Sequence, residues 1–145
     1  TTISDEGLML VQSRHSFYGA KRIRASYGGY VHGQAERLRK RSEEGRKGFD
    51  PKLGKRTAKH ARHCLRLLIQ GRTLLQTGEI PIDMTNYRDY LFSVGEIAET
   101  SPNQFQVLVE RELKHLDEVK TTLPEVADAD LINKLLINIR KSSFA

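Results

Sequence analysis

Apolar residues recur at steps of three and four along most of the chain, which is the spacing of one face of an α-helix. One such run predicts a long helix over residues 17–42, either continuous or divided at the Gly28-Gly29 pair. A second run predicts a helix over residues 55–77. It ends at Gly78, a residue that tolerates the left-handed conformation found at helix ends, and Pro81 prevents the helix from resuming. Two long helices therefore form the first half of the predicted fold.

Shorter patterns account for the rest of the chain. They predict helices over residues 8–13, 87–94, 102–123 and 131–139. The glycine-rich stretch 42–54 predicts a loop, and the alternation of apolar and other residues at 79–84 predicts a short extended segment. Together the patterns predict an all-α fold, an irregular bundle of about five to six helices in one domain covering residues 1–145.

Charge divides the sequence into unlike halves. Residues 14–72 hold 17 lysines and arginines against 4 acidic residues, a net charge of +13, whereas residues 73–145 have a net charge of −5. A field polarised in this way attracts anions, and phosphate is the commonest anionic group that proteins bind. The basic half is expected to face a nucleotide or a nucleic acid. A solvated basic face, or one that meets an acidic protein, is the alternative.

The lone cysteine, Cys64, indicates a reducing compartment, because it has no partner for an internal disulfide. Residues 1–13 lack the basic and apolar regions of an export signal, and no apolar run is long enough to span a membrane. We therefore expect a cytoplasmic protein with no membrane partner.

The segment 59–78 carries the strongest chemical signal. On a helix, its apolar residues form one buried stripe, and four polar residues line up beside that stripe at steps of four, three and four. These polar residues are Lys59, His63, Arg66 and Gln70. Lysine and arginine suit phosphate oxygens, and histidine and glutamine suit a base or a sugar. The stripe is a candidate binding site, with a solvated flank as the alternative.

Metal sites are not expected in this chain. His60, His63 and Cys64 lack a fourth ligand at the spacing typical of zinc sites, and the neighbouring cations repel a metal ion. Asp128 and Asp130 have the spacing of paired carboxylates, but the helical pattern that follows at once favours a helix cap at one of them.

Several of these motifs together resemble a known family. The stretch GGYVHGQAERL at 28–38, the KH and HCLRLL motifs within 59–68, the TGEI motif at 77–80 and the closing helix 131–140 resemble nucleotidyltransferases of the DNA polymerase beta superfamily. The similarity is to the RNA-repair-associated branch found in bacteria and phages, and it covers residues 8–142. It corresponds to the carboxyl-terminal helical half of that family.

The resemblance implies a division of labour. Family members carry paired aspartates that bind two divalent metal ions in an amino-terminal sheet domain, and this chain contains no such motif. We therefore expect a substrate-facing helical module that lacks catalytic residues, with Mg²⁺ and the chemistry supplied by another domain or a separate chain. Matching positions add Tyr30 and Gln34 to the candidate substrate-binding residues.

Two other functions remain open. A stand-alone RNA- or DNA-binding module would contact the nucleic-acid backbone through basic residues of the first long helix, and a basic protein-interaction domain would dock on an acidic partner. The candidate backbone-contacting residues are Arg22, Arg24, Arg37, Arg39, Lys40 and Arg41.

Overall fold

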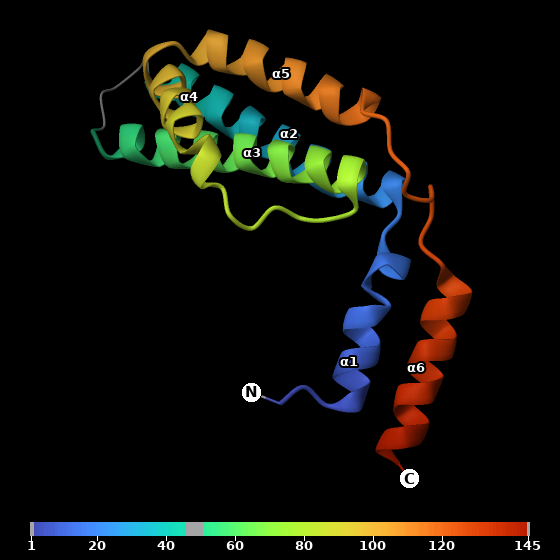
Figure 1. Ribbon diagram of the computed structural model, residues 1–145. Helices are drawn as coiled ribbons and strands as arrows, with labels where there is room; N and C mark the ends of the chain where they lie inside the picture. The colour runs from blue at the N-terminus through green and yellow to red at the C-terminus, as the bar shows by residue number, and fades with distance from the viewer. Residues whose placement is uncertain (1, 46–50, 145) are drawn as a thin grey trace. The chain divides into compact units, whose positions relative to one another are not determined.

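The computed structural model describes residues 2–45 and 51–144. Within these ranges the chain forms six α-helices and two short 3₁₀ helices, and it contains no β-strand (Figure 1). The α-helices are α1 (Asp5–Gln12), α2 (Ala20–Gly45), α3 (Pro51–Thr77), α4 (Arg88–Thr100), α5 (Pro102–Glu118) and α6 (Ala129–Ser143). The 3₁₀ helices are η1 (Arg14–Phe17) and η2 (Thr85–Tyr87). The predicted all-α class is confirmed.

The chain divides into two compact units. The first consists of Thr1–Ile23 and Leu123–Ala145, and the second of Arg24–Thr122. Helix α2 begins in the first unit and continues in the second. The expectation of a single domain stays a prediction.

The first unit joins the two ends of the sequence through its backbone. The Ala20 amide donates a hydrogen bond to the Pro124 carbonyl at 2.8 Å. Gly19 permits this approach, because a Cβ atom at this position would lie 2.8 Å from the Ala127 nitrogen. These contacts bring α1 and α6 into the same unit although they are far apart in the sequence.

Side-chain caps fix the starts of both helices in this unit. The Ser4 hydroxyl accepts a hydrogen bond from the Gly7 amide at 3.1 Å, and the Asp128 carboxylate accepts one from the Leu131 amide at 3.0 Å. The predicted cap of the last helix is therefore confirmed, and it is Asp128 rather than Asp130. Each cap satisfies an amide that has no partner inside its helix.

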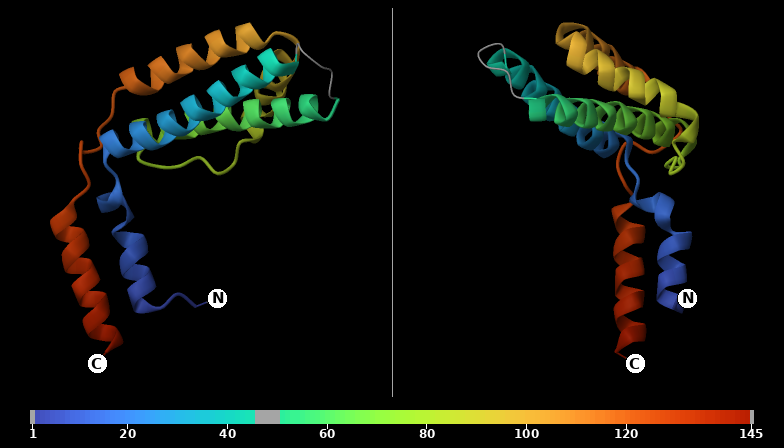
Figure 2. Two further views of the ribbon diagram at one scale, coloured as in Figure 1. Left: turned by 180° about the vertical axis from the view of Figure 1, so that it is seen from behind. Right: turned by 90° about the vertical axis from the view of Figure 1, so that its left-hand side faces the viewer.

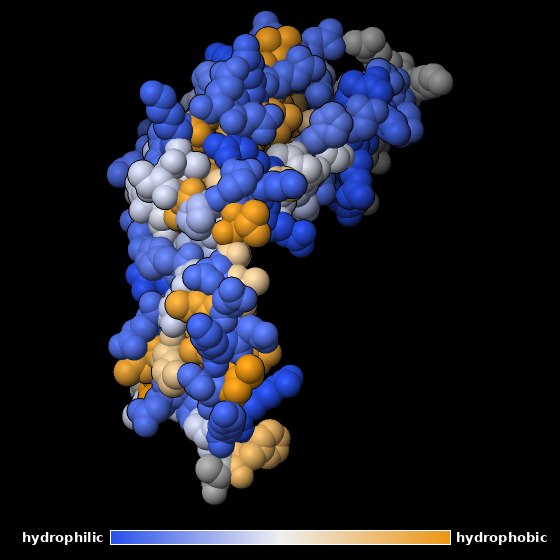
Figure 3. Space-filling view, turned by 90° about the vertical axis from the view of Figure 1, so that its right-hand side faces the viewer, coloured by the Kyte–Doolittle hydropathy of each residue, from blue (hydrophilic) through white to orange (hydrophobic). Residues whose placement is uncertain are grey.

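The surface of the first unit is partly apolar, as Figure 3 shows around α1 and α6. The exposed apolar residues of these two helices are Leu8, Leu10, Val11, Leu131, Leu136 and Ile137. In the described parts of the chain, no helix is both long enough and apolar enough to cross a membrane.

The second unit holds the larger core. Helices α2, α3 and α5 lie lengthwise side by side in Figures 1 and 2, and α4 packs on α3 and α5. The largest fully buried side chains are Phe105, Leu65, Leu68, Leu75, Leu116, Val31, Val94, Val109 and Cys64. The apolar stripe predicted for residues 61–75 is confirmed, because Ala61, Cys64, Leu65, Leu68 and Leu75 are all buried.

The two long helices extend further into the predicted loop 42–54 than their sequence pattern indicated. Helix α2 begins only at Ala20, after η1, and runs through the Gly28-Gly29 pair without a break to Gly45. Helix α3 begins at Pro51, a residue that the first turn of a helix tolerates. Residues 46–50 of the predicted loop lie outside the described residues.

The later boundaries also differ from the prediction, for reasons of tertiary packing. Helix α4 continues beyond Val94 to Thr100, because Gly95 and Ala98 are buried. Helix α5 ends at Glu118, not near residue 123. The Arg24 guanidinium donates to the carbonyls of Leu116 and Val119 at this end, at 3.3 and 2.8 Å, and so satisfies carbonyls that no further helical turn would reach.

The connection between α3 and α4 is irregular. Gly78 has a φ of 75° and ends α3 in the left-handed conformation, as predicted. The extended segment predicted at 79–84 forms no strand, because no described residues pair with its backbone in a sheet. Instead, the Gln70 side-chain amide donates to the Pro81 carbonyl at 2.9 Å and ties the segment to α3.

Candidate functional site

A basic groove lies between α3 and the start of α4. It has a volume of about 480 Å³, and its lining residues are Lys59, Arg62, His63, Arg66, Met84, Thr85, Arg88, Leu91 and Phe92. Three of the four residues in the predicted stripe, Lys59, His63 and Arg66, therefore meet in one hollow. We call these nine residues the basic groove.

Four cationic side chains face this groove without an acidic partner. Lys59, Arg62, Arg66 and Arg88 have no carboxylate within 4.0 Å among the residues that the structure describes. Asp83, which directly precedes Met84 of the groove, accepts hydrogen bonds from Thr85, and these bonds lower the pKa of its carboxyl. Like charges gathered in this way repel one another, so an anion in the groove would be stabilised.

An aromatic ring holds two of these cations. The Arg62 guanidinium carbon lies 4.8 Å from the centre of the Phe92 ring, and that of Arg88 lies 5.9 Å from it. Both distances suit cation–π contact. Gly95 makes room for Arg62, because a Cβ atom there would come within 3.0 Å of its Nη1 atom. Phe92 thus positions two guanidinium groups without neutralising their charge.

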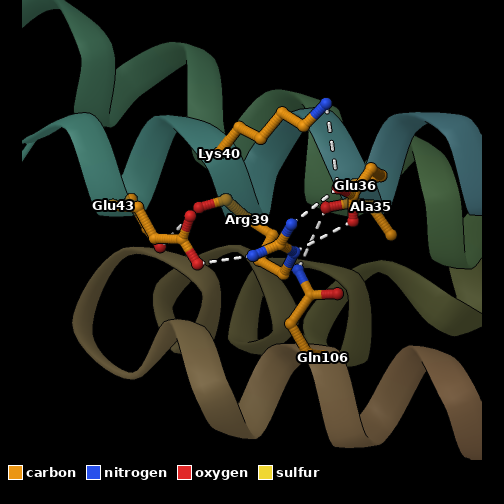
Figure 4. A network of polar contacts seen from close by, with 7 residues as sticks. Ala35, Glu36, Arg39, Lys40, Glu43 and Gln106 are labelled. Carbon is orange, nitrogen blue, oxygen red and sulfur yellow. Dashed lines mark hydrogen bonds and ion pairs between the residues drawn. The ribbon is translucent and has the colours of Figure 1, made fainter.

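Several cations elsewhere in the second unit are engaged by acceptors. Figure 4 shows Arg39 held by two carboxylates of its own helix: it donates to Glu36 at 2.7 and 2.9 Å and also to Glu43. Arg72 and Arg111 both donate to Glu112, at 2.8 and 3.1 Å. In contrast to these pairs, the four cations that line one hollow in the basic groove have no carboxylate partner among the described residues.

His63 lies at the edge of the groove in its neutral form. Arg66 Nη2 lies 2.9 Å from His63 Nδ1, and arginine can only donate, so Nδ1 accepts and the proton is on Nε2. Partial burial lowers the pKa of His63, and the charges of Arg66 and His60 lower it further. The imidazole also makes an edge-to-face contact with the Tyr30 ring, whose centre is 5.6 Å away at an interplanar angle of 88°.

A second hollow adjoins the basic groove at His63. It has a volume of about 380 Å³ and is lined by Ser26, Tyr27, Tyr30, His63 and Leu67. Tyr30 thus lies beside the predicted stripe, and its role in substrate binding stays a prediction. Gln34 lies one helical turn beyond Tyr30 on α2 and is half-buried.

Gln70 is the exception within the predicted stripe. Its amide holds the Pro81 carbonyl, and it does not line the basic groove. The segment that it ties to α3 leads to Met84 and Thr85, which do line the groove. Gln70 is therefore placed to position one wall of the site and does not face its interior.

The six candidate backbone-contacting residues differ in their local contacts. Arg24 binds the end of α5, and Arg39 and Lys40 pair with Glu36. Arg22 and Arg37 are exposed, and Arg41 is half-buried, with one guanidinium nitrogen fully buried and without a hydrogen-bond partner among the described residues. Contact of these six residues with a nucleic-acid backbone stays a prediction.

Sequence reasoning missed six of the nine groove residues, among them Arg62, Arg88 and Phe92. Arg62 lies on the same helix as the predicted stripe, three residues after Lys59 and four before Arg66, so helical spacing could have included it. Arg88 and Phe92 are four residues apart on α4, which places them on one face of that helix. No signal in the sequence, however, indicates that this face meets α3.

No protein-family model, curated protein or solved structure matches this chain. The described residues also contain no cluster of three or more His, Cys, Asp or Glu side chains that could hold a metal ion. A groove lined by four cationic side chains does not fit the Mg²⁺ that the family resemblance implies.

Proposed function

We propose that the chain binds a phosphate-bearing substrate, a nucleoside triphosphate or a nucleic-acid strand, through the basic groove. The observation that supports the proposal is the set of four cationic side chains that face one hollow and have no carboxylate partner in the described part of the chain. Arginine presents a planar array of donors that matches phosphate oxygens, and lysine adds a compact charge. A phosphate group would bind these donors and relieve their mutual repulsion.

We further propose that this module is the substrate-facing part of a nucleotidyltransferase. Support comes from the sequence resemblance, whose HCLRLL motif contributes Arg66 to the groove. In this proposal the groove holds the phosphates of the substrate while another domain or chain supplies Mg²⁺ and the transfer chemistry. The groove residues would then act by binding and orienting the substrate.

Direct binding of inorganic tripolyphosphate and of a short single-stranded RNA, measured by titration calorimetry, tests the proposal. Replacing Arg62, Arg66 or Arg88 by Gln is expected to weaken binding by about tenfold or more, since each removes a charged hydrogen bond. Arg140→Gln removes an equal charge from α6 and is the matched control. Equal affinity in the groove variants and in the control would contradict the proposal.

Thermal stability separates binding from a structural role. The groove cations lack carboxylate partners among the described residues and repel one another. Removing one relieves this repulsion, which offsets the loss of its contact with Phe92 or His63, so the melting temperature is expected to change little. A groove variant that binds poorly because it is partly unfolded would instead melt earlier.

The relative affinities for RNA and for tripolyphosphate distinguish the proposed substrates from each other. A stand-alone nucleic-acid-binding module would bind RNA with an affinity that falls steeply with salt. Preference for RNA over tripolyphosphate favours a strand as the substrate, whereas preference for the free polyphosphate favours a nucleoside triphosphate.

A further inference from the structure

The second hollow differs chemically from the basic groove that it adjoins. Three of its lining residues, Ser26, Tyr27 and Tyr30, come from α2, and the other two, His63 and Leu67, come from α3. None is a lysine, an arginine or a carboxylate. His63 lines both cavities, so a ligand passing this side chain would leave a field of positive charge and enter a neutral, largely aromatic one. We call it the tyrosine hollow.

Its aromatic rings are held in place by close packing. The Tyr27 ring lies directly against α3 at Gly71, where a Cβ atom would come within 2.8 Å of the ring carbon Cγ. Tyr30 makes an edge-to-face contact with His63, and 45% of its surface remains exposed. An exposed aromatic ring fixed at the mouth of a hollow can stack against another flat ring.

A row of neutral polar groups accompanies these rings. Ser26, Tyr30 and Gln34 follow one another at steps of four along α2 and therefore share one stripe of that helix. Within the described chain, neither the hydroxyl groups of Ser26 and Tyr30 nor the side-chain amide of Gln34 makes a side-chain hydrogen bond. These groups can both donate and accept, as recognition of an uncharged heteroaromatic edge requires.

We propose that the tyrosine hollow receives a nucleobase while the attached phosphates lie in the basic groove. The ligand is then a nucleotide unit, either free or within a strand, rather than a bare polyphosphate. Tyr30 supplies the stacking surface, Ser26 and Gln34 contact the edge of the base, and neutral His63 lies between base and phosphate. This inference rests on the proposed function, because the basic groove must bind the phosphates.

Comparison of ligands with and without a base tests the inference in the full chain. Calorimetric titration would use ATP against inorganic tripolyphosphate, and a five-nucleotide RNA against the same strand lacking its bases. Stacking of one base is expected to make the base-containing ligand of a pair bind about tenfold more tightly or better. The pair with the larger difference identifies a free nucleotide or a strand as the ligand.

Three variants of the proposed base site and one control test whether the preference for a base arises in the tyrosine hollow. Tyr30→Leu is expected to abolish the preference for base-containing ligands and to leave tripolyphosphate binding unchanged, while Tyr30→Phe retains the stacking and most of the preference. Tyr18→Leu is the matched control, because Tyr18 makes the same type of edge contact with His15, at 5.7 Å and 88°, in the first unit. Gln34→Ala is expected to alter the preference among different bases.

The outcomes separate this inference from the proposed function. If both members of each pair bind equally, or if Tyr30→Leu weakens tripolyphosphate as much as ATP, the tyrosine hollow is not a base site, and the basic groove remains a phosphate site. If no phosphate-bearing ligand binds the wild-type chain, the proposed function fails and this inference fails with it.

Discussion

Glu112 offers the sharpest test of the energetics of the second unit. It is the one buried charged side chain among the described residues, with 8% of its surface exposed. From α5 it accepts hydrogen bonds from Arg72 on α3 at 2.8 Å and from Arg111 at 3.1 Å. We predict that Glu112→Gln, which keeps the shape and removes the charge, lowers the free energy of unfolding by about 2 kcal/mol at neutral pH.

The magnitude follows from the exposure of the partners. Breaking a fully buried ion pair costs about 3–5 kcal/mol, because a charge is left buried and unpaired. Here the side chains of Arg72 and Arg111 are 30% and 59% exposed, so solvent screens part of that cost. The remaining loss is about 1.5–3 kcal/mol, the range for a hydrogen bond to a charged group.

The effect of Glu112→Gln should depend on pH. Burial raises the pKa of Glu112, but hydrogen bonds from Arg72 and Arg111 outweigh burial and hold it below 4.5. Since the folded pKa lies below the unfolded one, the stabilisation is complete above the unfolded value of 4.5 and disappears as the pH falls through the folded value. The difference between wild type and variant should therefore shrink in acid.

Urea denaturation followed by circular dichroism, at about pH 7 and about pH 3, measures both effects. Glu118→Gln is the matched control, because Glu118 lies on the same helix and its pairing with Lys114, at 3.7 Å, is exposed. An exposed pair contributes little. The reasoning is refuted if the two variants lose equal stability near neutral pH, or if the loss at Glu112 is the same at both pH values.

Three further predictions concern local structure. Burial raises the pKa of Cys64 to about 12, so a thiol reagent should label the native chain much more slowly than the chain in denaturant, and equally fast labelling would contradict the buried position. Gly71→Ala should lower the melting temperature, because overpacking against Tyr27 costs about 1–3 kcal/mol and outweighs a gain of about 1 kcal/mol in helix propensity. Gly29→Ala is the control and should raise the melting temperature, because a Cβ atom at residue 29 meets nothing within 4 Å. Asp128→Ala should cost about 1 kcal/mol in urea denaturation through loss of the α6 cap, whereas Asp128→Asn keeps an acceptor and should cost less; equal losses would show that capping is not its role.

Helical periodicity carried most of the fold prediction. The apolar stripe of α3, the left-handed Gly78 and a cap of α6 at Asp128 or Asp130 were all predictable from residues only a few positions apart, and the structure selects Asp128. The predicted helix boundaries were less accurate where contacts with a segment distant in the sequence determine the end of the helix. Helix α5 ends where Arg24 binds its last carbonyls, and these residues are more than 90 positions apart in the sequence.

The sequence predicted one part of the candidate site, and the tertiary structure determined the other part. Because residues three and four apart share a helix face, the sequence by itself determined that Lys59, His63 and Arg66 lie together beside a buried stripe. Only the tertiary structure brought Arg88 and Phe92 opposite them, through a helix crossing that Gly95 permits. Spacing sets the face on which a side chain lies, but which faces meet depends on packing between segments distant in sequence.

The tertiary structure also decided which charged side chains form ion pairs. Composition alone established that the first half of the chain is strongly basic. It did not establish which cations are neutralised, since Arg39 and Arg72 have carboxylate partners while Arg62 and Arg66 have none among the described residues. An ion pair needs two side chains within a few ångströms of each other, so the fold determined which positive charges remain available to a ligand.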